Sequence, residues 1–120
     1  MGKYDDQLSV LFENAAQRMW KLSSGSNRYF TNYEFIRSAT EDHQRVYVQL
    51  LNAVIAEIDS NRVFGTAHAR IGDRLGKLAV QLGYDQDKNP QGIQDYNIWG
   101  KTVTPIVYRR TNRVNEPEQQ

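Results

Sequence analysis

The sequence predicts a mainly helical α+β domain with three long helices and a small C-terminal β-hairpin. Three stretches repeat apolar residues every three or four positions, which is the spacing of one face of a helix. Segments 102–104 and 106–108 are instead rich in β-branched and aromatic residues, which favours strands. The 120 residues fit one domain. We expect a single globular domain over 1–113 and a disordered acidic tail over 114–120.

The first helix is predicted over residues 5–23. Its apolar side chains recur at spacings of four and three, at Leu8, Phe12, Ala15, Met19 and Leu22. The segment 23–27, SSGSN, then ends the helix, because serine, glycine and asparagine favour a loop. The heptad-like spacing would also suit a homodimer built on this helix, although two heptads are short for a coiled coil.

Two helices are predicted in the middle of the chain. Thr31 and Glu34 have the spacing of a capping box, which would start a short helix through Ala39. Thr40 suits the N-cap of a second helix over 41–59. That segment carries the broadest apolar stripe of the chain, at Val46, Tyr47, Leu50, Leu51, Val54, Ile55 and Ile58. We therefore expect it to be the central helix of the core.

The third long helix is predicted over 66–83, after a short strand at 62–64. Its apolar face consists of Ile71, Leu75, Leu78 and Leu82. Gly83 suits the C-terminal stop of this helix. Gly72 and Gly76 lie inside the helix, where glycine is unfavourable, so we expect another backbone to pack closely against them.

The last part of the domain is predicted to contain the hairpin. Residues 90–97 allow two readings, because Asn89-Pro90 fits the start of a short helix, whereas the same stretch could join the hairpin. Gly100 suits a two-residue turn before the strand 102–104. Pro105 cannot donate to a sheet ladder, so the strand 106–108 is expected at a sheet edge or with a bulge.

Two features of this organisation favour DNA binding. The segment 78–84, LAVQLGY, resembles the LAxxLG stretch that opens many helix-turn-helix units, although the loop after it is long for such a unit. The order of the predicted elements, in which helices and a short strand precede a final hairpin, is also that of a winged helix.

Charge is divided unevenly along the chain. Residues 1–61 carry six basic and eight acidic side chains, whereas 62–113 carry nine basic and four acidic ones. A basic half of this kind favours a polyanionic partner. The residues predicted to contact nucleic acid are Arg70, Arg74, Lys77, Lys101, Arg109, Arg110 and Arg113. Bases would be read by Gln91, Gln94 and Asn97 if 90–97 is the recognition helix, or by Arg70 and Arg74 if the preceding helix is.

A protein–protein interaction or self-assembling module, such as an adaptor or a small inhibitor, is the alternative function. The chain contains seven tyrosines, two tryptophans and four phenylalanines, and aromatic side chains are enriched at interfaces. The interface candidates are Trp20, Tyr29, Phe30 and Tyr33. Such a partner would be a heterologous protein or a second copy of the chain.

Catalysis, metal binding and membrane insertion have no support in the sequence. The absence of cysteine excludes disulfides and thiolate zinc sites. The two histidines, His43 and His68, lie on different predicted helices and match no metal-ligand spacing. Nucleotide-binding and hydrolase motifs such as GxGxxG and GxSxG are missing. We therefore predict no cofactor and no metal, and a binding protein rather than an enzyme.

The expected location is the cytoplasm. The sequence has no apolar run of 18 residues that would span a bilayer. Its first ten residues, MGKYDDQLSV, carry two aspartates and lack the basic and apolar regions of a secretory signal.

Overall fold

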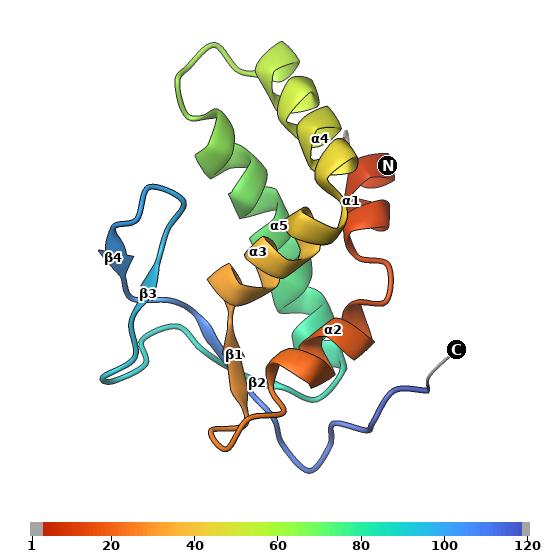
Figure 1. Ribbon diagram of the computed structural model, residues 1–120, viewed down its shortest axis with the longest axis vertical. Helices are drawn as coiled ribbons and strands as arrows, with labels where there is room; N and C mark the ends of the chain where they lie inside the picture. The colour runs from red at the N-terminus through yellow and green to blue at the C-terminus, as the bar shows by residue number, and fades with distance from the viewer. Residues whose placement is uncertain (1–3, 119–120) are drawn as a thin grey trace.

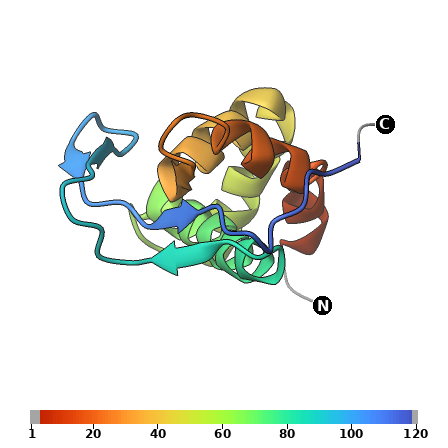
Figure 2. The same ribbon diagram turned by 90° about the horizontal axis from the view of Figure 1, so that it is seen from below.

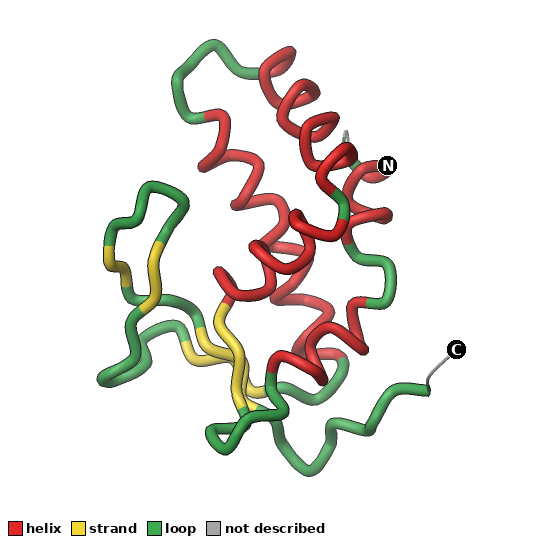
Figure 3. The backbone as a smooth tube through the Cα atoms, viewed as in Figure 1, coloured by secondary structure: helices red, strands yellow, loops and turns green. Residues whose placement is uncertain are grey.

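The computed structural model describes residues 4–118 and has the predicted α+β class, with most of its regular structure in helices (Figures 1 and 3). The helices are α1 (Asp5–Leu11), α2 (Ala15–Leu22), α3 (Asn32–Asp42), α4 (Gln44–Glu57) and α5 (Val63–Gln81). The strands are β1 (Tyr29–Thr31), β2 (Asp85–Asp87), β3 (Asp95–Tyr96), β4 (Thr102–Val103) and β5 (Val107–Arg109).

Helix α5 is the centre of the fold, because α3, α4 and β2 all pack on it. Its fully buried residues are Ala67, Ile71, Leu75 and Ala79. Helix α4 packs on α1, α3 and α5, but its outer side is uncovered: Leu50 and Val54 are buried, whereas Val48 and Ile55 are more than half exposed. The prediction that 41–59 is the central helix is therefore wrong, since a broad apolar stripe is buried only where neighbours cover it.

Strand β5 lies in the middle of a three-stranded antiparallel sheet of order β1-β5-β2. Tyr108 of β5 faces Phe30 of β1 on one side and Gln86 of β2 on the other. The prediction of an edge strand is therefore wrong. Pro105 precedes β5 instead of interrupting it, so its missing N–H leaves the sheet ladder intact.

The strands β3 and β4 form a separate antiparallel hairpin, which we call the β3–β4 hairpin. Asp95 pairs with Val103, and Tyr96 with Thr102. Residues 97–101 connect the strands in place of the expected two-residue turn, and Gly100 takes the left-handed backbone that glycine favours, with φ of 74°. Residues 90–97 contain no helix. Seen from below, the hairpin lies at one end of the molecule, to the side of the helices (Figure 2).

The predicted first helix is divided into α1 and α2. Asn14 takes a left-handed conformation with φ of 56° and interrupts the helix. Helix α1 packs on α4, whereas α2 packs on α3 and β1. The two helices therefore run in different directions. Phe12 and Ala15 stay buried on either side of the break. The apolar spacing continues through the break at Asn14 because α1 and α2 face the same core.

The capping box at the start of α3 is confirmed. The Thr31 hydroxyl accepts a hydrogen bond from the Glu34 N–H at 3.0 Å, and the Glu34 carboxylate accepts one from the Thr31 N–H at 3.0 Å. The helix then continues past Thr40, whose hydroxyl donates to the Ile36 carbonyl at 2.7 Å. The break falls instead at His43, so the prediction of an N-cap at Thr40 is wrong.

Helix α5 begins at Val63, so the predicted strand at 62–64 does not form. It ends as expected: Gly83 follows it with φ of 101°, and the Tyr84 N–H donates to the Ala79 carbonyl at 3.0 Å. Because β2 comes next, the segment 78–84 closes a helix before a strand. The helix-turn-helix interpretation of this segment is therefore wrong.

Residues 110–118 contain no regular secondary structure (Figure 3). Val114 nevertheless packs against the core, and the Gln17 amide donates to the Glu118 carbonyl at 3.0 Å. Disorder of the acidic tail stays a prediction, and residues 119–120 lie outside the described part of the chain. None of the helices within 4–118 has the length and apolar character needed to cross a membrane.

Candidate functional site

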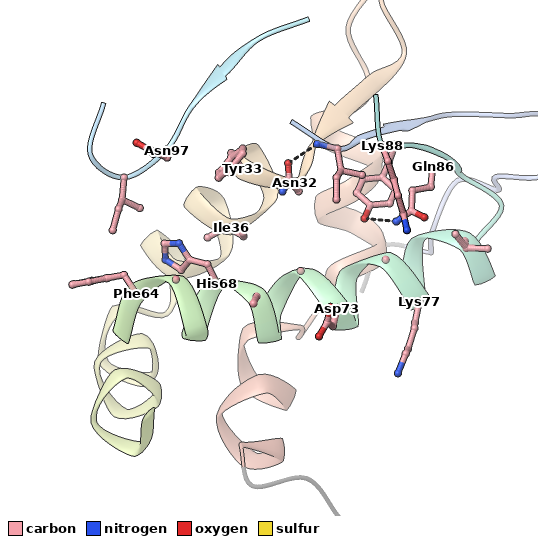
Figure 4. Close-up of a pocket in the computed structure, with 18 of the residues that line it drawn as sticks. Asn32, Tyr33, Ile36, Phe64, His68, Asp73, Lys77, Gln86, Lys88 and Asn97 are labelled. Carbon is pink, nitrogen blue, oxygen red and sulfur yellow. Dashed lines mark hydrogen bonds between the residues drawn. The ribbon is translucent and has the colours of Figure 1, made fainter. Parts of the chain in front are cut away.

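A cleft of about 950 Å³ lies between α5, the first turn of α3 and the β3–β4 hairpin (Figure 4). Helix α5 forms its floor along most of its length. Asn32 and Tyr33 of α3 and Asn97 of the hairpin loop line the opposite side. Gln86 and Lys88, at the end of β2 and after it, line the part nearest the sheet.

The floor of the cleft exposes the backbone of α5. Residues without a side chain, or with only a methyl group, recur there at Gly65, Ala69, Gly72 and Gly76. A Cβ at Gly72 would meet no atom within 4 Å, and one at Gly76 would lie 3.2 Å from the Gln86 amide nitrogen. The prediction that another backbone packs on Gly72 and Gly76 is therefore wrong. Gly72 faces open space, and Gly76 faces side chains.

The tip of the β3–β4 hairpin leans on the first turn of α5. The rings of Trp99 and Phe64 meet edge to face, with their centroids 5.5 Å apart. Trp99 is still 66% exposed, and Ile98 beside it is 41% exposed. The Asn97 side-chain oxygen shapes the loop by accepting hydrogen bonds from the N–H groups of Trp99 and Lys101, both at 3.0 Å. The hairpin therefore presents apolar surface at one end of the cleft.

The base of the hairpin is fixed to α3 through Asp95, a buried carboxylate. The Thr31 hydroxyl donates to Asp95, and an Arg37 guanidinium nitrogen lies 3.1 Å from its Oδ1. A second Arg37 nitrogen donates to the Tyr96 carbonyl at 3.1 Å. Sequence reasoning missed Asp95, because no local pattern connects an aspartate to residues 58 positions earlier. These contacts set the position of the hairpin relative to α5.

His68 of α5 lies in the wall of the cleft beside Tyr47 of α4. Its Nε2 lies 2.6 Å from the Tyr47 hydroxyl oxygen, and the two rings are stacked with centroids 5.9 Å apart. Burial lowers the pKa of His68 below its usual 6.5 and raises the pKa of Tyr47 above its usual 10. Near neutral pH this pair is therefore uncharged and serves to join α4 to α5.

The basic side chains of α5 lie on one side of the helix but differ in exposure. Arg70 and Lys77 are exposed, and Lys77 projects from the side of α5 that faces away from Tyr33 and Gln86 (Figure 4). Arg74 is half-buried, with its guanidinium 5.5 Å from the centre of the Phe12 ring. Arg70, Arg74 and Lys77 all line a second, smaller cleft between α1 and α5, together with Asp5 and Asp73.

The arginines at the C-terminal end contact acidic and aromatic side chains of the same chain. Arg109 lies 3.6 Å from an Asp87 carboxylate oxygen and 5.6 Å from the centre of the Tyr29 ring. Arg113 pairs with Asp85 at 2.8 Å. Each of these two arginines therefore has an acidic side chain of β2 beside it, which partly offsets its charge.

Arg110 holds the sheet against α2. Its guanidinium lies 3.5 Å from the centre of the Trp20 ring, and Nη2 donates to the Trp20 carbonyl at 2.6 Å. The same nitrogen donates to the buried Ser23 hydroxyl at 3.0 Å. Arg110 and Trp20, assigned from the sequence to nucleic acid and to a partner protein respectively, therefore contact each other.

The remaining interface candidates differ in exposure. Phe30 is fully buried between Tyr84, Tyr108 and Phe35 and is not accessible to a partner. Tyr29 is half-buried beneath Arg109. Tyr33 is also half-buried, but it lines the main cleft. Of the predicted contact residues, Lys77 and Tyr33 both line the main cleft but project from different sides of it (Figure 4), while Lys101 is exposed on the hairpin loop.

The cleft also contains cationic and aromatic residues that sequence reasoning did not select. Lys88 and Trp99 are exposed there, and their only sequence signals are a polar loop and a turn glycine. Within residues 4–118, histidine and acidic side chains form no group of three that could hold a metal ion. Comparisons of the chain with models of known protein families, with curated proteins and with solved structures find no match.

Proposed function

We propose that this protein binds duplex DNA, with the exposed face of α5 entering the major groove and the β3–β4 hairpin contacting the flanking backbone. The observation that carries the proposal is the strand order β1-β5-β2, with α5 directly before β2 and the hairpin between β2 and β5. This is the order of a winged helix, in which the helix before the second strand reads DNA and the hairpin is the wing.

The cleft supports the proposal, because it lies between the two elements that would hold the duplex. Its open floor along α5 allows a sugar–phosphate strand to approach the helix closely. Amide side chains at Asn32, Gln86 and Asn97 line the cleft and can donate to phosphate oxygens. Helix α4 is inserted between α3 and α5, so α5 follows a longer connection than the tight turn of a helix-turn-helix.

Four exposed cations lie on the elements assigned to binding, two of them in the lining of the main cleft: Arg70, Lys77, Lys88 and Lys101. Two belong to α5, one follows β2 and one lies in the hairpin loop. Such side chains neutralise phosphates without reading sequence. Asp73 lies between the two cations of α5 and is exposed. A carboxylate there would repel phosphate but can accept a hydrogen bond from the cytosine amino group, so we assign it to base contacts.

The proposal is tested by removing the three lysines among these cations one at a time. Replacing Lys77, Lys88 or Lys101 with alanine should weaken binding to a mixed-sequence duplex and reduce the dependence of log Kd on log salt by about one unit each. Arg113→Ala is the matched control, because it removes a cation that is paired with Asp85 and does not line the cleft. Fluorescence anisotropy at several salt concentrations measures both quantities. Equal losses in the control and the test variants would refute the assignment.

A protein partner in the same cleft is the second candidate function. It is favoured by the exposed apolar side chains at the rim, which are Val80, Ile98 and Trp99. Binding of that kind would depend weakly on salt and would be lost in Trp99→Ala but kept in Lys77→Ala. DNA binding predicts the opposite response to salt and to the loss of Lys77, so the same variants separate the two functions.

A further inference from the structure

A further cleft of about 650 Å³ lies where the tip of the β3–β4 hairpin meets the first turns of α5. We call it the tip cleft. Its size is within the range of about 300–1,000 Å³ that is usual for ligand-binding clefts. The side chains that matter here come from the hairpin, from α5 and from the loop before α5, and they are Trp99, Phe64, Arg70 and Arg62. Trp99 and Phe64 line the main cleft as well, so the two clefts meet at this pair of rings.

The Trp99 ring is held in place, but most of its surface is open. Its backbone N–H donates to the Asn97 side-chain oxygen at 3.0 Å, and its ring meets the Phe64 ring at an interplanar angle of 82°. An edge-to-face contact covers at most one face of the indole, and Trp99 is 66% exposed. Nucleic-acid bases stack on aromatic side chains with an open face, because every base has a flat π-face of its own.

The tip cleft differs from the other two clefts in charge. Arg62 and Arg70 line it and are exposed, and none of the described residues that line it is acidic. The main cleft contains Asp73, and the cleft between α1 and α5 contains Asp73 together with Asp5 and Glu57. Within residues 4–118 neither Arg62 nor Arg70 forms an ion pair. Both guanidinium groups are therefore available to an anion, and their planar set of N–H donors suits phosphate.

A ligand that matches both features has a flat ring with a phosphate close to it, as a nucleotide has. Inside a duplex both faces of each base are covered by its neighbours, so Trp99 can stack only on a base that has left the stack. Gly65 and Ala69 line the tip cleft without large side chains, and a Cβ at Gly65 would meet no atom within 4 Å. Nothing in this part of α5 therefore obstructs a base or a sugar.

We propose that the tip cleft binds an unpaired nucleotide of DNA, with its base stacked on Trp99 and its phosphates bound by Arg62 and Arg70. This inference rests on the proposed DNA binding and names the substrate class, which is a duplex that continues into a single strand. The tip cleft adjoins both α5 and the hairpin, which are the elements assigned to the duplex. A strand that leaves the duplex at this end of the main cleft enters the tip cleft directly.

Anisotropy titrations of three labelled probes test the proposal. One is a blunt duplex, and the others carry the same duplex with a single-stranded overhang of about five nucleotides at the 3′ or the 5′ end, which matches a small single-strand site. The blunt end offers a ring face but no phosphate beyond it. The wild type should bind at least one overhang probe about tenfold more tightly than the blunt duplex, which is the effect of one stacked base.

Trp99→Ala and Arg62→Ala should each reduce this preference to less than about threefold, because one stacking face or one phosphate contact is lost. Their affinity for the blunt duplex should stay close to that of the wild type. Trp99→Phe keeps an aromatic ring and should keep most of the preference. Tyr96→Ala is the matched control for Trp99, since Tyr96 is exposed on the same hairpin but does not line the tip cleft. Arg45→Ala, which removes an exposed arginine of α4, is the control for Arg62.

The outcomes separate this inference from the proposed function. If no probe binds at about 50 mM salt, where backbone contacts are strong, both are overturned. If the wild type binds the blunt and the overhang probes equally, duplex binding stands and the tip cleft is not a nucleotide site. A preference that survives both Trp99→Ala and Arg62→Ala also overturns the tip cleft, and circular dichroism checks that each variant keeps the fold. Loss of the preference in these two variants, with both controls unchanged, supports it.

Discussion

The basic residues of the C-terminal half look alike in the sequence but differ in what they contact. Arg109 and Arg113 pair with carboxylates of β2, and Arg110 lies against the Trp20 ring. Lys77 and Lys88 are exposed at the cleft instead. A count of charges cannot separate these roles, because it contains no information on which acid or ring folds against each cation. The difference gives each residue a distinct expected effect on stability and on binding.

Arg110→Ala is expected to lower the free energy of unfolding by about 2 kcal/mol, because hydrogen bonds to a charged group and a cation–π contact are lost together. Trp20 fluorescence should also change, since the guanidinium leaves its ring. Urea unfolding measures the stability. Arg110→Lys keeps the charge but lacks the planar guanidinium group, so it should lose most of the same free energy of unfolding. An alanine variant as stable as the wild type would show that the contact is not structural.

The His68–Tyr47 pair should make stability depend on pH. Burial lowers the pKa of His68 in the folded protein below 6.5, its value in the unfolded chain. Above pH 6.5 the imidazole is neutral in both states and its full contribution to stability is present. As the pH falls below 6.5, the unfolded chain takes up the proton first, so the free energy of unfolding decreases until the lowered pKa is reached.

Urea unfolding at pH 7.5 and 5.5 checks this expectation. The wild type should be less stable at pH 5.5, and His68→Gln, which keeps a hydrogen-bonding side chain without a titrating one, should lose most of that difference. His43→Gln is the matched control, because His43 is the other histidine of the chain, lies between α3 and α4 and should leave the difference intact. An unchanged pH dependence in His68→Gln would contradict the assignment.

At the scale of the elements, the sequence predicts features that depend on neighbours in the chain. The Thr31–Glu34 capping box, the apolar face of α5 and the stop at Gly83 all form as expected. Features that depend on tertiary packing were not predictable in this way. The break at Asn14 follows from the different partners of α1 and α2, and Val48 and Ile55 are exposed because α1, α3 and α5 pack on the other sides of α4.

Alanine substitutions of Gly72, within α5, and of Gly83, just after it, should change stability in opposite directions. Gly72→Ala should raise the free energy of unfolding by about 1 kcal/mol, because alanine favours a helix and its Cβ would meet no atom within 4 Å. Gly83→Ala should lower it by at least about 2 kcal/mol, since φ is 101° and a Cβ would lie 2.9 Å from the Arg113 carbonyl carbon. Thermal unfolding of both variants measures the difference. Similar effects at the two positions would contradict the backbone geometry described for α5 and its C-terminal stop.

At the scale of the whole molecule, the decisive features join distant parts of the chain. Tyr29 pairs with Arg109 across the sheet, and Asp95 holds the hairpin to Thr31 and Arg37. Local periodicity contains no information on such pairings, so the sequence could supply the order of most elements but not the strand order or the cleft. The candidate surface therefore keeps the predicted residues of α5 and the hairpin loop and leaves out the C-terminal arginines, while the expectation of a DNA-binding protein remains a proposal.

The most direct test of that proposal is the salt dependence of duplex binding by the wild-type protein. Four exposed cations around the cleft and α5 should give a slope of about −3 to −4 for log affinity against log salt. Anisotropy titrations of a labelled duplex at about 50, 100 and 200 mM salt measure this slope, over a range in which backbone contacts weaken strongly. A slope near that value supports α5 and the hairpin as the DNA-binding surface. No binding at 50 mM salt, or binding that is unaffected by salt, would contradict the account.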